Sequence, residues 1–188
     1  MEIRDAHTSC FVRLTPTGYE FRKTVGDPDD DNWLNIKGRI RSPEDVWTFH
    51  EPALQVPEAE AIGAWLRDAA AGRATPLQPE ADGSTWPAVE TIEPVVSVGL
   101  VRYEPTEVSV RFFLWLEAAR PGRRDYLEEG DTGYFLDITT TPEELERAAA
   151  EWESELAAFP YRGAPEGAKP RIRGPWARLA DRLRGLAN

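Results

Sequence analysis

The sequence is poor in cysteine and histidine, and each shortage excludes a class of protein. A single cysteine, Cys10, among 188 residues rules out an internal disulfide and is typical of a reducing compartment. Two histidines and that cysteine are too few for a tetrahedral zinc site. No apolar run approaches the ~18–20 residues of a membrane-spanning helix, and the N-terminus does not read as a signal peptide. We therefore expect a cytoplasmic protein with no membrane span.

Basic residues are also in the minority. There are 22 Lys and Arg against 33 Asp and Glu, a formal net charge of −11. The segment 162–188 is basic, however, so the acidity is concentrated in 1–161. An anionic surface repels phosphate groups, so we expect no nucleic-acid partner for the main body and a basic protein partner instead. Glycines and prolines mark 163–170 as a linker, which predicts a single domain over 1–161 and a basic tail over 162–188.

Alternating apolar residues predict a largely antiparallel sheet of about six or seven strands. In 33–41, for example, Leu34 and Ile36 share one face, whereas Lys37, Arg39 and Arg41 share the other. The tetrad 15–18 is interpreted as the turn of a first hairpin. The expected strands lie at 8–14, 19–24, 33–41, 46–51, 95–103, 108–116 and 134–138.

Two main helices are expected to pack on this sheet. The first begins at Pro57 and ends before Gly72. The second has Thr141 as its capping residue and ends before Pro160. Separate strands and helices, without regular alternation, predict an α+β fold.

A short amphipathic helix is expected in the basic tail. Trp176, Leu179 and Leu183 recur at helical spacing, and arginines occupy the other sides. A basic amphipathic helix can bind a membrane, a partner groove or nucleic acid. Docking on the main body and docking on a partner both remain open.

The sequence offers no catalytic residue. His7 and His50 lie outside any catalytic motif, and the strand-like surroundings of Cys10 favour a buried thiol. A glycine-rich phosphate loop and a G-x-S-x-G motif are both absent. We therefore predict a protein that is not an enzyme and has no cofactor.

The sharpest acidic run, at 27–31, is the candidate for a cation or partner site. Asp27, Asp29 and Asp31 occupy the first, third and fifth positions of a calcium-loop pattern. The pattern then fails, because Asn32 replaces its glycine and Gly38 replaces its bidentate glutamate. We predict no metal site and interpret the run as a solvated or partner-facing acidic loop.

Several short motifs follow one another in a characteristic order. They are the acidic run leading into 32–38, the segment 46–49, the helix 57–71, the strands 93–98 and 108–115, and 135–138 leading into the helix that closes at Pro160. This order resembles the immunity proteins of WapI-type wall-associated toxins over about residues 8–160. The insert 72–92 and the basic tail depart from the family pattern.

The resemblance implies a non-enzymatic protein that binds a toxin domain inside the producing cell. Nuclease toxin domains are commonly basic, so an acidic partner gains electrostatic attraction. On this hypothesis the carboxylates set the association rate and the tryptophans supply affinity, although core packing is the alternative for both tryptophans. The expected contact residues are Asp27, Asp29, Asp30, Asp31, Trp33 and Trp47.

Two other classes of function stay open. One is a metal-assisted hydrolase that uses clustered carboxylates. The other is a regulatory or ligand-binding domain in which the insert 72–92 gates a pocket between sheet and helices. An apolar pocket with converging polar groups would favour the ligand-binding domain.

Overall fold

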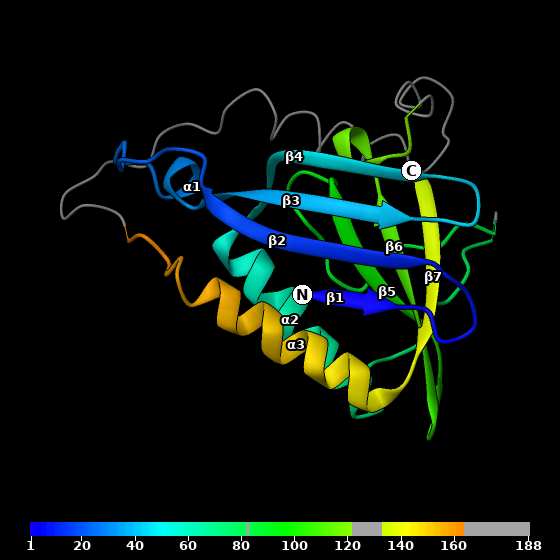
Figure 1. Ribbon diagram of the computed structural model, residues 1–188. Coiled ribbons are helices and arrows are strands. Elements are labelled where there is room, and N and C mark those ends of the chain that lie inside the picture. Colours follow the sequence, from blue (N-terminus) through cyan, green and yellow to red (C-terminus); the bar gives the residue numbers. More distant parts are fainter. Residues whose placement is uncertain (82, 122–132, 164–188) are drawn as a thin grey trace.

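The structure is a computed structural model that describes residues 1–81, 83–121 and 133–163 (Figure 1). The expected tail helix at 175–186 lies outside these residues. The elements in chain order are β1 (Glu2–Arg4), β2 (Phe11–Tyr19), α1 (Pro28–Asp31), β3 (Trp33–Arg41), β4 (Val46–Gln55), α2 (Val56–Ala70), β5 (Val96–Glu104), β6 (Glu107–Leu114), the 3-10 helix η1 (Leu116–Ala118), β7 (Tyr134–Thr140) and α3 (Pro142–Leu156).

The strands form two antiparallel sheets, in the orders β1-β2-β3-β4 and β5-β6-β7. The α+β class is confirmed, but the expectation of one sheet of six or seven strands is not. The two sheets meet where β1 approaches β7. There the Ala6 N–H donates to the Thr139 carbonyl over 2.7 Å, and the Asp5 carboxylate accepts from the Thr139 N–H over 2.8 Å. The Asp5 side chain thus takes the place of the next backbone hydrogen bond to β7, and the backbone pairing between the two sheets goes no further.

The expected first hairpin is wrong, because β2 runs straight through the tetrad that was taken for its turn. Pro16 pairs with Ile36 of β3, and a bulge follows between Pro16 and Gly18. The register with β1 extends only to Arg13 of β2. Pro16 therefore lies where one side of β2 has no neighbouring strand, which is where a sheet tolerates a residue without an N–H.

Both predicted long helices are present, and they hold the two sheets together. The Thr141 side chain accepts from the Glu144 N–H over 3.2 Å and so caps α3. The buried indole of Trp152 in α3 donates to the Ala59 carbonyl of α2 over 2.7 Å. One continuous apolar core joins side chains from both sheets and both helices.

The helices leave one sheet face open. In Figure 1, α2 and α3 lie close together near β1, and the face of the four-stranded sheet that is turned to the viewer carries no described helix. None of the helices in the described part of the chain is long and apolar enough to cross a membrane.

Replacing Asp5 by Ala is expected to lower the free energy of unfolding at pH 7 by about 1–2 kcal/mol. The reason is that its carboxylate accepts from the N–H groups of His7, Thr8 and Thr139. Asp68→Ala, at an exposed position, is the matched control and should change stability by under about 0.5 kcal/mol.

This stabilisation should also depend on pH. Burial alone would raise the pKa of the Asp5 carboxyl, but the hydrogen bonds outweigh it and lower the pKa below its ordinary value. A carboxyl with a lowered pKa stabilises the fold above its unfolded pKa and loses this effect as the pH falls through its folded pKa. Urea denaturation of the wild type and of Asp5→Ala should therefore show a difference in the free energy of unfolding that narrows below about pH 4. A difference that stays constant with pH would contradict this role of Asp5.

Candidate functional site

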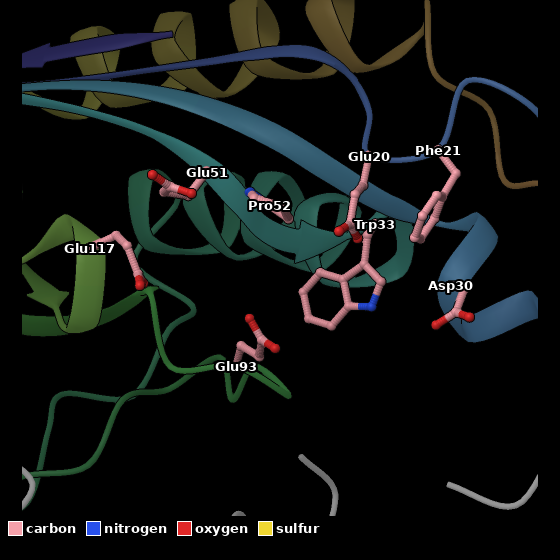
Figure 2. A pocket seen from close by; sticks show the side chains of 8 residues that line it. All are labelled: Glu20, Phe21, Asp30, Trp33, Glu51, Pro52, Glu93 and Glu117. Atoms are coloured by element: carbon pink, nitrogen blue, oxygen red, sulfur yellow. The ribbon is translucent and has the colours of Figure 1, made fainter. Parts of the chain in front are cut away.

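A cavity of about 300 Å³ opens beside Trp33, the first residue of β3 (Figure 2). Its walls carry five carboxylates, two aromatic rings and one proline, and no basic side chain is among them. We call it the acidic pocket, and its lining residues are Glu20, Phe21, Asp30, Trp33, Glu51, Pro52, Glu93 and Glu117.

Segments far apart in the sequence build the pocket. Trp33 is the first residue of β3, and Glu51 lies in β4 beside the bulge that follows Leu34 of β3. Glu117 belongs to η1, which is tied to β4 because the Trp47 indole donates to the Ala118 carbonyl over 3.0 Å. In Figure 2 the carboxylates of Glu93 and Glu117 lie across the open space from the strands that carry Glu51 and the Trp33 ring.

Glu58 positions the wall that carries Glu93. Its carboxylate accepts from the Gln55 N–H over 2.7 Å, and so caps α2, and it also accepts from the Ile92 N–H. Burial raises the pKa of the Glu58 carboxyl, the two hydrogen bonds partly offset this, and the charge of Glu93 raises the pKa further. Sequence reasoning missed this residue, although a glutamate three positions after Gln55 is the spacing of a capping box.

Burial and like charge act on the pocket carboxyls. Burial is the largest cause that raises the pKa of Glu93, followed by the charges of Glu117 and Glu20. Burial also raises the pKa of Glu20, and the charge of Asp30 adds to it. The fold therefore holds negative charges close together at some cost in free energy.

Most of these carboxylates have no counter-charge. Within the described residues, no ion pair reaches Glu20, Glu51, Glu93 or Glu117. On α3, by contrast, four glutamates are paired with arginines. Arg67 binds two glutamates of α3, and Arg147 binds two others. The acidic pocket is thus a concentration of uncompensated negative charge.

The acidic run that the sequence singled out is divided between different environments. Asp27 caps α1 by accepting from the Asp29 N–H over 3.1 Å, and Asp29 itself is exposed. Asp30 lines the acidic pocket. Asp31 is fully buried, and its carboxylate accepts from the N–H groups of Val25 and Gly26.

The two tryptophans named as contact residues also differ. Trp33 is half-buried and lines the pocket, next to the exposed ring of Phe21. Trp47 lies in the core with 5% of its surface exposed, which matches the core-packing alternative. Because Asp31 and Trp47 are buried, we do not carry them into the proposed contact surface.

The described residues contain no group of three or more His, Cys, Asp or Glu side chains placed to hold a metal ion. Asp31, the fifth residue of the calcium-loop pattern, is used by two backbone amides instead. The two imidazoles have different partners: His7 contacts Glu107, and His50 contacts Thr17. Cys10 is buried and free.

The segment after α3 packs against one border of the pocket. The Arg162 guanidinium lies 3.3 Å from the centroid of the Tyr19 ring and donates to the Phe21 carbonyl over 2.7 Å. Asn32 donates to the Arg162 carbonyl and accepts from its N–H. Arg162, which composition assigns to the tail, therefore holds the β2–α1 connection in place.

Comparison with protein families finds a match to the immunity protein WapI-like family over residues 3–160. The matched range contains every described helix and strand except the first residue of β1. It also includes 72–92, which the sequence had set apart as an insert. No curated protein and no solved structure matches the chain.

Removing one charge from the pocket is expected to stabilise the protein. Glu93→Gln should raise the free energy of unfolding at pH 7 by a few tenths of a kcal/mol, a small effect because solvent screens a half-exposed carboxyl. The raised pKa means that ionised Glu93 destabilises the fold at neutral pH, and that this cost disappears as the pH falls through its folded pKa.

Thermal unfolding at pH 7 and pH 4 checks this expectation. Glu93→Gln should be more stable to thermal unfolding than the wild type at pH 7, and this difference in stability should be smaller at pH 4. Glu104→Gln, at an exposed position at the end of β5, is the control and should give no gain. Destabilisation by Glu93→Gln at pH 7 would show that the carboxylate is needed to hold the pocket wall.

Proposed function

The chain belongs to the immunity protein WapI-like family, and we propose that it neutralises a basic toxin domain in the cytoplasm by binding it through the acidic pocket. The proposed action is non-covalent and needs no catalysis. Family membership supports toxin immunity. The choice of a basic toxin, with nucleases as the leading class, rests on the chemistry of the pocket.

The observation that carries this proposal is the group of four glutamates around one cavity, Glu20, Glu51, Glu93 and Glu117, which no ion pair within the described residues reaches. Burial is the largest cause that raises the pKa of Glu93, and repulsion from Glu117 and Glu20 raises it further. An arginine or lysine side chain entering the cavity relieves this repulsion and makes charge-assisted hydrogen bonds. A nuclease domain presents such side chains because it binds phosphate groups.

Apolar surface beside the carboxylates supports a protein partner. Phe21, on the rim, is 38% exposed, and Ile92, next to Glu93, is 48% exposed. Protein interfaces combine a few aromatic or apolar anchors with a polar rim. Trp33 and Phe21 are the proposed anchors. Asp30 lines the pocket, and Asp27 and Asp29 extend the acidic surface beyond it.

The pocket fits the ligand-binding alternative less well than it fits a basic protein partner. That alternative expects an apolar cavity with a few converging polar groups, whereas five of the eight lining residues are carboxylates. We also propose that residues 1–161, together with Arg162, form the binding domain. The role of the rest of the basic tail stays a separate question, because 164–188 lie outside the described residues.

The test is the association rate with the cognate domain, taken as the C-terminal domain of a large secreted protein encoded next to this chain. Glu20→Lys combined with Glu93→Lys should slow association about tenfold or more at low salt, because it replaces attraction by repulsion. The difference should shrink at 0.5 M salt, where charges are screened beyond about 4–5 Å.

Glu104→Lys combined with Glu143→Lys is the matched control. These glutamates are exposed and lie on elements remote from the pocket, at the end of β5 and the start of α3. The control changes the net charge equally, so it should keep the rate within about threefold. Equal slowing by both pairs would place the contact elsewhere. A toxin domain that still kills cells expressing the wild-type chain would end the immunity proposal.

A further inference from the structure

The open face of the four-stranded sheet is basic, although the chain as a whole is acidic. Antiparallel register places Arg4, Phe11 and Arg41 in one row, and Glu2, Arg13 and Arg39 in the next. Residues opposite one another project from the same side of a sheet. We call this surface the basic face, and its cationic residues are Arg4, Arg13, Lys37, Arg39 and Arg41.

Three guanidinium groups of the basic face converge on one aromatic ring. Those of Arg4, Arg39 and Arg41 lie 5.1, 5.6 and 5.9 Å from the centroid of the Phe11 ring. The ring is 5% exposed, so it is covered on this face. Cation–π attraction favours each contact, but the three like charges still repel one another.

The positive charge of the basic face is mostly uncompensated. Arg4 pairs with Glu2 over 2.6 Å, and no ion pair within the described residues reaches Arg13, Lys37, Arg39 or Arg41. The buried Nε of Arg41 has no hydrogen-bond partner in the described part of the chain.

Nearby acidic residues of α3 are already engaged. Glu151 pairs with Arg147, and Glu155 pairs with the N-terminal ammonium group. Together with Glu2 they line one hollow with Arg13, so they reduce the positive charge at that edge of the basic face. Lys37, Arg39 and Arg41 are not among the residues that line this hollow, and an anion from outside the chain is a source of counter-charge for them.

We propose that the basic face binds the phosphate backbone of a single nucleic-acid strand. Alternate residues along a strand lie about 7 Å apart and neighbouring strands about 5 Å apart, so the face presents a grid of cations to a chain of phosphates. Arginine is well suited to such phosphates because its planar fork donates two parallel hydrogen bonds. The hydroxyls of Thr15 and Thr48 lie in the same rows and add donors of the kind that contact phosphates.

The same face lacks the features of a protein interface. Its rows contain one exposed large apolar side chain, Val46, which is 43% exposed and lies at the end of a row. Stable protein interfaces depend on central aromatic or apolar anchors, and Phe11 is covered. Attraction on this face is therefore electrostatic, which suits a phosphate chain better than an acidic protein surface.

The net charge of −11 weakens this binding without abolishing it. At an ionic strength of 0.15 M the Debye length is about 8 Å, so a bound phosphate responds mainly to the charges of the face beneath it. We expect micromolar or weaker affinity with a steep dependence on salt. This inference does not depend on the toxin, since the partner and the surface are both different.

Fluorescence anisotropy with a labelled 20-nucleotide RNA of mixed sequence, at 50 mM salt and without any toxin, tests the proposal. The full chain should bind with a log–log salt slope of up to about −3.5, because five cations each contribute about 0.7 for a single strand. Arg13→Gln combined with Arg39→Gln should weaken binding at least about tenfold and reduce the slope by about 1.4.

Arg73→Gln combined with Arg102→Gln is the control, since it removes two exposed arginines from other elements. It should change the affinity less than about threefold, because neither residue lies on the basic face. Three results would overturn the proposal: no binding at 50 mM salt, equal weakening by both double variants, or displacement of the RNA by polyglutamate at a charge concentration equal to that of the RNA. The last result would assign the face to acidic proteins.

Discussion

Mutual repulsion among carboxylates in the acidic pocket is the constraint on which the functional interpretation depends. Isolated glutamates on a surface move apart, or they pair with lysine and arginine. Here four segments of the chain bring Glu20, Glu51, Glu93 and Glu117 to one cavity, and no ion pair within the described residues reaches these four. A fold that keeps such charges together has to be rigid at the walls, and a partner that supplies positive charge gains the free energy of the relieved repulsion.

The surrounding structure supplies that rigidity through polar groups aimed at backbone amides and carbonyls. Glu58 fixes the segment that leads into β5, the Trp47 indole ties η1 to β4, and buried Asp31 closes the loop before α1. Arg162 holds the β2–α1 connection by packing on the Tyr19 ring and donating to the Phe21 carbonyl. The contacts of Glu58 with Ile92, Trp47 with Ala118 and Arg162 with Phe21 join segments distant in sequence. The shared core of both sheets and both helices holds these segments together.

Local patterns predicted the elements whose signals are local. Alternation predicted β3, and Thr141 marked the start of α3. The division into two sheets was not predictable, because contacts between segments far apart in the chain, such as that of Asp5 with Thr139, have no local signal. The same holds for the pocket: Glu20, Glu51, Glu93 and Glu117 are single glutamates at strand ends with no common motif. In the acidic run, composition alone does not distinguish buried Asp31 from pocket-lining Asp30.

Net charge describes the chain as a whole and not its individual surfaces. The acidity of the chain predicts a basic partner, which stays a proposal, whereas the open sheet face carries five cationic side chains within that acidic total. Hydrogen–deuterium exchange on the complex with the cognate toxin domain tests the central claim most directly. Binding through the acidic pocket predicts new protection at residues 20–33, 51–52, 92–93 and 116–118, with β5 and β6 unchanged. Protection confined to the basic face or to the outer side of α3 would contradict it.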